Sequence, residues 1–245
     1  IPVLRNLREG FTGDEISEVS GIINGTANYI LTSMSENNDD FKTALAEAQK
    51  LGYAEADPTF DIEGNDTAHK VCILLNLAYN GLFDFKQIYI EGITKIEPID
   101  IEIASEMGYT IKLLGKAISN EKGYDGRVHP ALIKNSNLLA SVKGPFNALL
   151  IKGNFLGPTI SYGAGAGSHP TASAVVGDIV EIGRILANDR KHQTFPLSCT
   201  NETLVKKEII PIDEIETEYY LRFTVQDKVG VLAKITTILG DNNIS

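Results

Sequence analysis

The sequence has little positive charge and no long apolar run, and each shortage excludes a class of protein. Lysine and arginine total 22 against 32 aspartates and glutamates, which gives a net charge of −10. A nucleic-acid-binding face needs clustered basic residues, so this balance argues against a nucleic-acid partner. No apolar run approaches the ~20 residues that cross a bilayer, so the sequence predicts no membrane span.

Cysteine is scarce, and a dinucleotide-binding fingerprint is missing. The two cysteines, Cys72 and Cys199, lie far apart, and Cys72 falls in an apolar helical pattern where a buried, reduced thiol is usual. A reducing, cytoplasmic location fits this usage best. No strand leads into Gly-x-Gly-x-x-Gly and a helix, so the sequence predicts no Rossmann-type nucleotide-binding unit.

The length and the two ends indicate a piece of a longer protein. With 245 residues the chain has room for one large domain, or for one domain and a smaller one. It starts at Ile1-Pro2 without a methionine or a signal-peptide pattern, and it stops at Ile244-Ser245, just after a strand-helix pattern that ought to continue. We therefore expect both ends to be cut.

The N-terminal third predicts a strand followed by helices. Strand-like residues 15–23 run into Asn24-Gly25-Thr26, which breaks the strand and can cap a helix. The apolar spacing then predicts three helices, over residues 27–35, 40–51 and 66–79. The last is apolar nearly all round beyond its first turns, so it should be buried and present a polar end to a pocket.

From Gln87 onward the pattern changes to short strands. Strands separated by glycine, asparagine and proline turns are expected over 88–93, 110–117, 127–133 and 148–153, with one short helix over 101–108. The predicted fold class is α+β, a mixed and largely antiparallel sheet covered by helices on one face. Such a sheet could also serve for dimer formation.

The stretch 52–70 contains several acidic residues in a turn-rich loop and leads into the third helix with Asp66 and Lys70. Residues at i and i+4 share one helical face, so this carboxylate and this ammonium can address one small polar substrate. The alternative is a solvated surface ion pair worth a few tenths of a kcal/mol, and the spacing alone favours that alternative.

A glycine-rich turn over 163–167 is followed by Pro170 and a helix rich in small residues. Three alternating glycines let the backbone approach a ligand or another chain segment closely. The turn is not a P-loop, and its pattern leaves ligand contact and tight packing equally open.

A smaller module closes the chain. Alternating residues over 219–225 predict a strand, Asp227-Lys228-Val229-Gly230 a turn, and residues 231–239 a helix. The charged segment before it contains Pro211 and is expected to be a linker. The predicted boundaries are a domain over 1–205, a linker over 206–218 and an incomplete module over 219–245.

Three motifs in order make the chain resemble homoserine dehydrogenase. They are 21–31 (GIINGTANYIL), 52–70 (GYAEADPTFDIEGNDTAHK) and 163–178, and the resemblance covers about 1–198. The tail resembles the start of an ACT domain, although Val229 stands where that family usually has proline. Because only the first strand and helix of that domain are present, the chain alone cannot complete an effector pocket.

The resemblance implies an enzyme of threonine and methionine biosynthesis that interconverts L-homoserine and L-aspartate 4-semialdehyde. It implies that Lys70 is the proton donor and acceptor at the substrate hydroxyl and that Asp66 binds beside it. Glu55 would hold the substrate ammonium. Tyr53 and Thr26 would shape the pocket. The family also implies a homodimer.

The resemblance further implies NADP or NAD as cofactor, with Gly52, Gly165 and Gly167 near the nicotinamide. The backbone carbonyl of Ile1 would help to bind a monovalent cation. The family's nucleotide-binding half has no counterpart here, so we expect this chain to be the substrate and dimerisation domain and not to turn over alone. The helix over 171–186 would return to that half, so one of its apolar faces should be exposed or covered by a second copy.

Two other functions remain open. The chain could be a non-catalytic dimerisation module with a remnant of a regulatory ACT unit. It could also belong to another dehydrogenase of aldehydes or alcohols, in which Glu55 would have no substrate role. His129 and His169 have no metal-ligand spacing with other residues, so no metal site is predicted from them.

Overall fold

The structure, a computed structural model, describes residues 2–187 and 204–244. Its strands are β1 (Ile16–Ile22), β2 (Gly81–Phe83), β3 (Tyr89–Ile90), β4 (Tyr109–Asn120), β5 (Gly123–Lys134), β6 (Phe146–Gly153), β7 (Gly157–Ala164) and β8 (Val205–Lys207). Its α-helices are α1 (Val3–Arg5), α2 (Gly25–Asn37), α3 (Phe41–Lys50), α4 (Thr59–Ile62), α5 (Asn65–Tyr79), α6 (Pro98–Glu106), α7 (Ser168–Ala187) and α8 (Val231–Asp241). Short helical turns of other types are η1 (Asn6–Gly10), η2 (Phe85–Gln87), η3 (Leu138–Ser141) and η5 (Ile212–Glu214).

A six-stranded sheet with the order β3-β5-β4-β1-β6-β7 forms the centre of the fold. β3 and β5 run parallel, and the other neighbouring strands run antiparallel. A separate pair, β2 and β8, is parallel. The predicted α+β class with a mixed, largely antiparallel sheet is confirmed.

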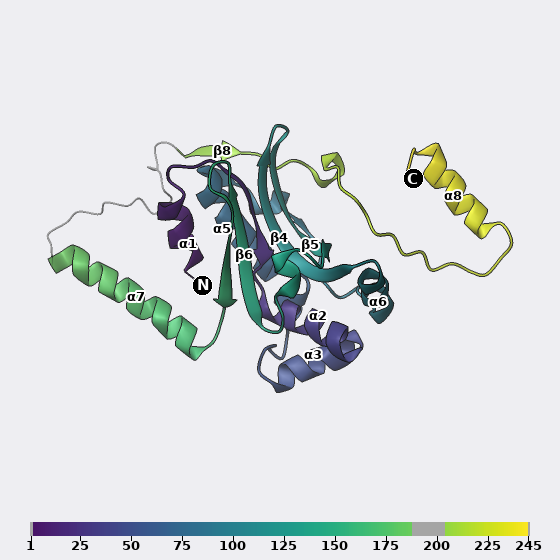
Figure 1. The fold of residues 1–245 in the computed structure, drawn as a ribbon, viewed down its shortest axis with the longest axis horizontal. Coiled ribbons are helices and arrows are strands. Elements are labelled where there is room, and N and C mark those ends of the chain that lie inside the picture. The colour runs from purple at the N-terminus through teal and green to yellow at the C-terminus, as the bar shows by residue number, and fades with distance from the viewer. Residues whose placement is uncertain (1, 188–203, 245) are drawn as a thin grey trace.

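Helices α2 and α5 pack on one face of this sheet (Figure 1). Val71 and Leu75 of α5 are completely buried there, and Ile111 and Leu113 of β4 belong to the same apolar core. At Gly115 of β4, an added Cβ would lie 2.7 Å from the Val71 side chain. The absence of a side chain at this position therefore lets α5 approach the sheet closely.

The opposite face of the sheet has a thinner cover. A smaller apolar cluster beneath η3 contains Ile22, Leu114, Ile133, Leu139, Ala140, Val142 and Ala148. On β7, Tyr162 lies opposite Ala148 and Ile160 lies opposite Leu150 in the register with β6. Directly opposed residues share a face. Ile160 and Tyr162 are exposed, so the sheet keeps an uncovered apolar area at its β7 edge.

Side-chain caps and left-handed residues set the ends of the helices. The Asn24 side chain accepts a hydrogen bond from the Ala27 backbone N–H at the start of α2, and Asp40 accepts one at the start of α3. Asn38 and Asn80 end α2 and α5 in the left-handed conformation, with φ of 61° and 48°. The three helices predicted for this region are confirmed, α2 being longer at both ends than its pattern predicts.

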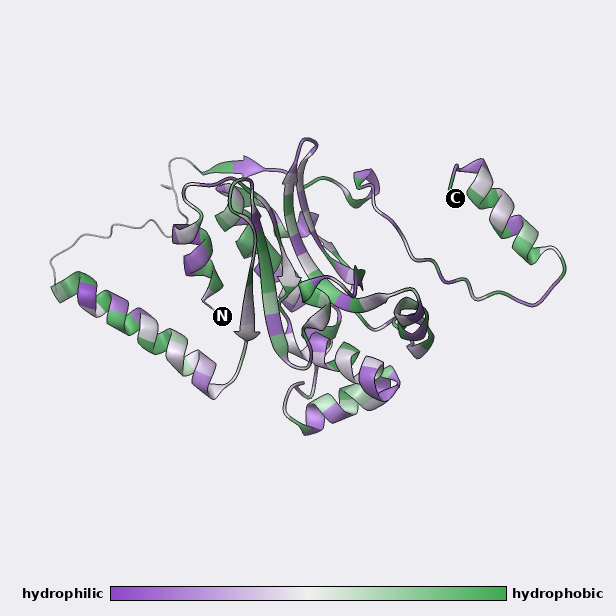
Figure 2. Cartoon of the chain, in the orientation of Figure 1, coloured by the Kyte–Doolittle hydropathy of each residue, from purple (hydrophilic) through white to green (hydrophobic). Residues whose placement is uncertain are grey.

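Helix α7 extends away from the sheet (Figure 1), and none of its residues is buried. Its exposed large apolar residues are Val175, Val176, Ile179, Val180, Ile182 and Leu186. Figure 2 shows hydrophobic residues along much of this helix. The Arg5 guanidinium pairs with Glu181 on this helix. The expectation of an exposed apolar face agrees with these exposures.

The C-terminal region differs from its prediction at one element. The pattern predicts a strand over 219–225, but this segment pairs with no strand in the described part of the chain. An alternating sequence forms a strand only where a neighbouring strand accepts its backbone hydrogen bonds. The helix expected over 231–239 is present as α8. β8 overlaps the start of the segment over 206–218 and pairs with β2, and Ile209 is buried, so the first part of this segment packs against the sheet domain.

Candidate active site

The first turns of α5 bring Asp66 and Lys70 together. Lys70 Nζ donates to Asp66 Oδ2 at 2.6 Å and to the backbone carbonyl of Ile23 at 2.9 Å. The Lys70 side chain is 44% exposed and the Asp66 side chain 22% exposed, so a small molecule can reach both. The second hydrogen bond ties the pair to the end of β1, which distinguishes it from a freely solvated surface ion pair.

Asn24 and Asp61 extend this pair into a network. The Asn24 amide Nδ2 donates to Asp61 Oδ1 at 2.6 Å and to Asp66 Oδ2 at 2.8 Å. Asp61 lies on the short helix α4, and Asn24 lies at the start of α2. The sequence pattern does not place either residue in the site. The one sequence feature that points to Asp61 is its place in the acidic stretch over 52–70. No such feature points to Asn24, because its role depends on tertiary contacts.

Thr26 and Tyr53 also meet at this end of α2. Thr26 Oγ1 donates to the Tyr53 backbone carbonyl at 2.6 Å, and the Tyr53 ring lies against Tyr29 with centroids 4.8 Å apart. Gly52, just before Tyr53, has a φ of +77°, a conformation that favours glycine. The structure therefore joins Thr26 to the loop that contains three of the predicted site residues.

Glu55 stays apart from this network. Its backbone carbonyl accepts a hydrogen bond from Gln49 Nε2 at 3.0 Å, which holds the loop. Its side chain is exposed, and no residue of 2–187 or 204–244 bonds to its carboxylate. This carboxylate is available to a ligand, and its predicted contact with the substrate ammonium stays a prediction.

The glycine-rich turn joins β7 to α7. A Cβ at Gly165 would overlap the amide of Asn147 on β6, so close packing requires glycine there. Gly167 has a φ of +121°, which also favours glycine. These constraints support the packing interpretation, while contact with a nicotinamide stays a prediction. Ile1 lies outside the described residues.

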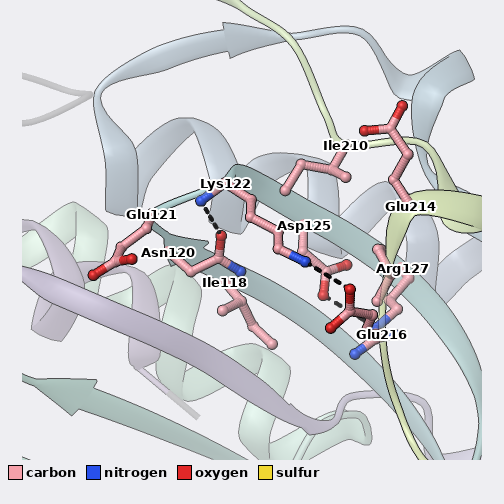
Figure 3. Close-up of a pocket in the computed structure, with 10 residues that line it drawn as sticks. Ile118, Asn120, Glu121, Lys122, Asp125, Arg127, Ile210, Glu214 and Glu216 are labelled. Atoms are coloured by element: carbon pink, nitrogen blue, oxygen red, sulfur yellow. Dashed lines mark hydrogen bonds and ion pairs between the residues drawn. The ribbon is translucent and has the colours of Figure 1, made fainter.

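A cavity of about 490 Å³ lies elsewhere, between the tip of the β4–β5 hairpin and residues 210–216 (Figure 3). Arg127 Nε and Asp125 Oδ2 form a buried ion pair at 3.2 Å beside it. Burial raises the pKa of the Asp125 carboxyl, although the positive charge of Arg127 opposes that shift. The Asp66–Lys70 network does not line this cavity.

The described residues contain neither a metal-binding cluster nor a membrane-spanning helix. No group of three histidine, cysteine, aspartate or glutamate side chains among them could hold a metal ion. No helix among them is long and apolar enough to cross a membrane.

Known proteins match this chain along its whole length. The sequence model of the family described as homoserine dehydrogenase matches residues 2–180, and that of the ACT domain matches residues 219–245. The chain belongs to the homoserine dehydrogenase family. The homoserine dehydrogenase of Neisseria gonorrhoeae is 47% identical over 245 residues, which are 100% of this chain and 56% of the relative. That of Pseudomonas aeruginosa is 45% identical with the same coverage.

Solved structures of the family share the fold. The crystal structure of a homoserine dehydrogenase from Thiobacillus denitrificans has a TM-score of 0.88 and 46% identity, and the match covers 98% of this chain and 56% of that one. A hyperthermophilic archaeal homoserine dehydrogenase in complex with NADPH has a TM-score of 0.63 and 29% identity, over 74% of this chain and 51% of that one. The chain therefore spans about half the length of the relatives it matches.

Proposed function

We propose that this chain is the substrate-binding and dimerisation part of an enzyme that interconverts L-homoserine and L-aspartate 4-semialdehyde. The observation that supports this proposal most strongly is the hydrogen-bonded network of Asn24, Asp66 and Lys70 at an accessible helix end. Family membership supplies the substrate class. Because the relatives are nearly twice as long, a nicotinamide-binding part outside this chain belongs to the proposal.

Lys70 handles the proton of the substrate hydroxyl. Oxidation of an alcohol removes a hydride from carbon and a proton from oxygen, so a base must lie beside that oxygen. The neutral Lys70 amine takes the proton, and its ammonium returns the proton to the carbonyl oxygen in the reverse direction. An ammonium has three N–H donors, and contacts with Asp66 and Ile23 occupy two of them. The third is left for the substrate oxygen.

Acidic side chains around this pair suit an amino-acid substrate. Glu55 binds the substrate ammonium, and Asp66 binds the hydroxyl together with Lys70. Asp61 adds a second carboxylate to the same end of the site through Asn24. Thr26 and the Tyr53 loop form the adjoining wall. A carboxylate within ~4 Å of an ammonium gains ~4 kcal/mol at an effective dielectric constant of 20, before desolvation is counted.

The glycines at two turns suit a cofactor that lies against the backbone. Gly52 is open to solvent at its Cβ position, whereas Gly165 already packs against Asn147. We therefore place Gly52 nearest to the nicotinamide, with the turn of Gly165 and Gly167 farther out. A bound NADP or NAD would accept the hydride. The NADPH of the archaeal relative supports this cofactor class without deciding between the two. A monovalent cation at the Ile1 carbonyl is also part of the proposal.

The proposal further includes a homodimer in the cytoplasm, and domains over 1–205 and 219–245 joined by 206–218. The uncovered apolar area around Ile160 and Tyr162 supports pairing of two sheets. Cys72 has no disulfide partner among the described residues, and the cytoplasmic location stays part of the proposal. The ACT match over 219–245 supports a separate C-terminal module.

Substitution of Glu55 tests the substrate assignment. In the complete polypeptide, Glu55→Gln removes the charge that faces the substrate ammonium, so we expect the KM for homoserine to rise by at least about 10-fold. Steady-state reduction of NADP⁺ and NAD⁺ with homoserine measures it, with Glu106→Gln, which neutralises an exposed carboxylate on α6, as the control. An unchanged KM would count against homoserine. Absence of homoserine turnover in the wild-type polypeptide would favour the alternative, a non-catalytic dimerisation and regulatory module.

A further inference from the structure

Asn24 uses every hydrogen-bonding group of its side chain at the candidate active site. Its Oδ1 accepts from the Ala27 backbone N–H at 2.8 Å, which caps α2. Its Nδ2 donates to Asp61 Oδ1 at 2.6 Å and to Asp66 Oδ2 at 2.8 Å. Asn24 is 6% exposed, so water does not compete freely for these bonds. One buried amide therefore links three helices, α2, α4 and α5.

The residue type follows from these contacts. Asparagine, aspartate, serine and threonine all cap helices well, because each offers an oxygen to the first free N–H groups. Of these four, asparagine alone also has an NH₂ group with two donors. A helix cap by itself would accept aspartate or serine at position 24. The two carboxylates that accept hydrogen bonds from the NH₂ group require an amide at this position.

The amide also fixes which carboxylate oxygens remain available. Asp66 Oδ2 accepts from both Asn24 and Lys70, whereas Asp66 Oδ1 has no hydrogen-bond partner among the described residues. Asp61 Oδ1 is bound to Asn24 in the same way. A carboxylate that is held through one oxygen presents the other in a fixed direction. The two N–H donors also reduce the repulsion between the two negative charges.

We propose that Asn24 is a positioning residue for the proton-transfer pair. It holds the Asp66 carboxylate in the orientation in which Lys70 faces the substrate hydroxyl, and it couples this pair to Asp61. This inference rests on the proposed function for its kinetic consequence, whereas the hydrogen-bond geometry stands independently of any activity.

The geometric part is tested on this chain by NMR. In ¹⁵N-labelled protein, the Asn24 side-chain amide is assigned by its disappearance in Asn24→Ser. We expect Asp61→Asn to shift one of its two protons and Asp66→Asn to shift the other, because each proton faces a different carboxylate. Glu36→Gln, an exposed residue at the far end of α2, should shift neither. An amide signal that ignores both aspartate substitutions would overturn the proposal.

The kinetic consequence of the proposal is tested in the complete polypeptide by replacing Asn24 with another helix-capping residue. Asn24→Ser keeps a capping oxygen but removes both amide donors, and a misplacement of about 1 Å in a catalytic pair costs on the order of 100-fold. We expect kcat for homoserine oxidation to fall by about 10- to 100-fold, with a larger solvent deuterium isotope effect because proton transfer becomes slower. Asn24→Asp, which keeps the shape and the cap, should lose activity too. Asp40→Ala removes the cap of α3 and should leave kcat unchanged.

The outcomes separate the inference from the function. Wild-type kcat in Asn24→Ser would show that Asn24 is only a helix cap and would overturn the proposal. If Asn24→Ser does not fold, Asn24→Asp and the NMR measurement decide. If the wild-type polypeptide does not oxidise homoserine, the proposed function fails, and the NMR result still decides whether Asn24 holds both carboxylates.

Discussion

Lys112 on β4 is a charged side chain held inside the protein with neutral partners only. It is 2% exposed, and its ammonium donates to Asn28 Oδ1 at 2.9 Å and to the Val142 carbonyl at 2.6 Å. Burial, with a smaller contribution from Lys143, lowers the pKa of Lys112 from 10.5 to about 8. Glu36 opposes this shift. The folded state therefore loses this proton at a lower pH than the unfolded state does.

The sign of this difference gives a prediction for stability. Below pH 8 both states hold the proton, and the cost of burying the charge is fully present. Between pH 8 and 10.5 the unfolded state binds more protons, so the free energy of unfolding rises with pH, by about 3 kcal/mol in total. Lys112→Met should lose this rise. Urea unfolding of both proteins at pH 7, 8, 9 and 10 measures it, and the difference between them cancels other titrating groups. Parallel curves would contradict the buried charge.

At the residue scale, what the sequence predicts depends on how local the contact is. Asp66 and Lys70 are four residues apart on one helix, so the periodicity places them together correctly. Asn24 and Asp61 are 37 residues apart and belong to different helices, so their contact follows only from the packing of α2 against α4. The cap at Asn24 is readable from the sequence, whereas its two donated hydrogen bonds are not.

At the scale of elements, the contact between α5 and β4 depends on one glycine. An added Cβ at Gly115 would lie 2.7 Å from Val71 Cγ2 and 3.0 Å from Thr67 Cγ2. We therefore expect Gly115→Ala to lower the free energy of unfolding by about 1–3 kcal/mol, because the tightly packed helix must shift. Gly13→Ala, where nothing lies within 4 Å of the added Cβ, is the matched control. Chemical denaturation of the three proteins measures the effect, and equal losses in both variants would show that α5 has room to move.

Elements with strong local signals are the predictable ones. α3 and α5 lie within one residue of their predicted ends, because caps, glycine and left-handed asparagines mark those ends. The sequence pattern does not predict β7, because its glycines interrupt the apolar alternation that marks a strand. The short parallel pair of β2 and β8 joins residues more than 100 positions apart, and no local signal indicates such a pairing. The strand predicted over 219–225 has the right alternation but no neighbouring strand among the described residues.

At the scale of the whole molecule, apolar surfaces without a cover include the following two. One is the β7 edge around Ile160 and Tyr162, and the other is helix α7. We assign the first to a second copy of the chain, because an open sheet face next to an apolar cluster suits an interface with twofold symmetry. We propose that the second packs against a nicotinamide-binding part outside this chain.

Substitution at the β7 edge tests the dimer. Ile160→Glu places a charge on the proposed interface, where burial of an unpaired carboxylate costs several kcal/mol, so the dimer should dissociate. Sedimentation equilibrium of the chain at micromolar concentration should give a dimer for the wild type and a monomer for Ile160→Glu. Met107→Glu changes an exposed apolar residue just after α6 and should leave the dimer intact. A wild-type monomer, or a dimer that tolerates the charge at position 160, would contradict this assignment.

The role of Lys70 in proton transfer is the central claim for the complete molecule. Lys70→Met keeps the length of the side chain and removes the amine, so the complete polypeptide should lose about 100- to 10,000-fold in kcat for homoserine oxidation. The fall should be larger than any change in KM, because the lost contact acts on the transferred proton. Steady-state kinetics of wild-type and Lys70→Met proteins, with Lys50→Met on α3 as an exposed control, measure it directly. A Lys70→Met enzyme with wild-type kcat would contradict the account.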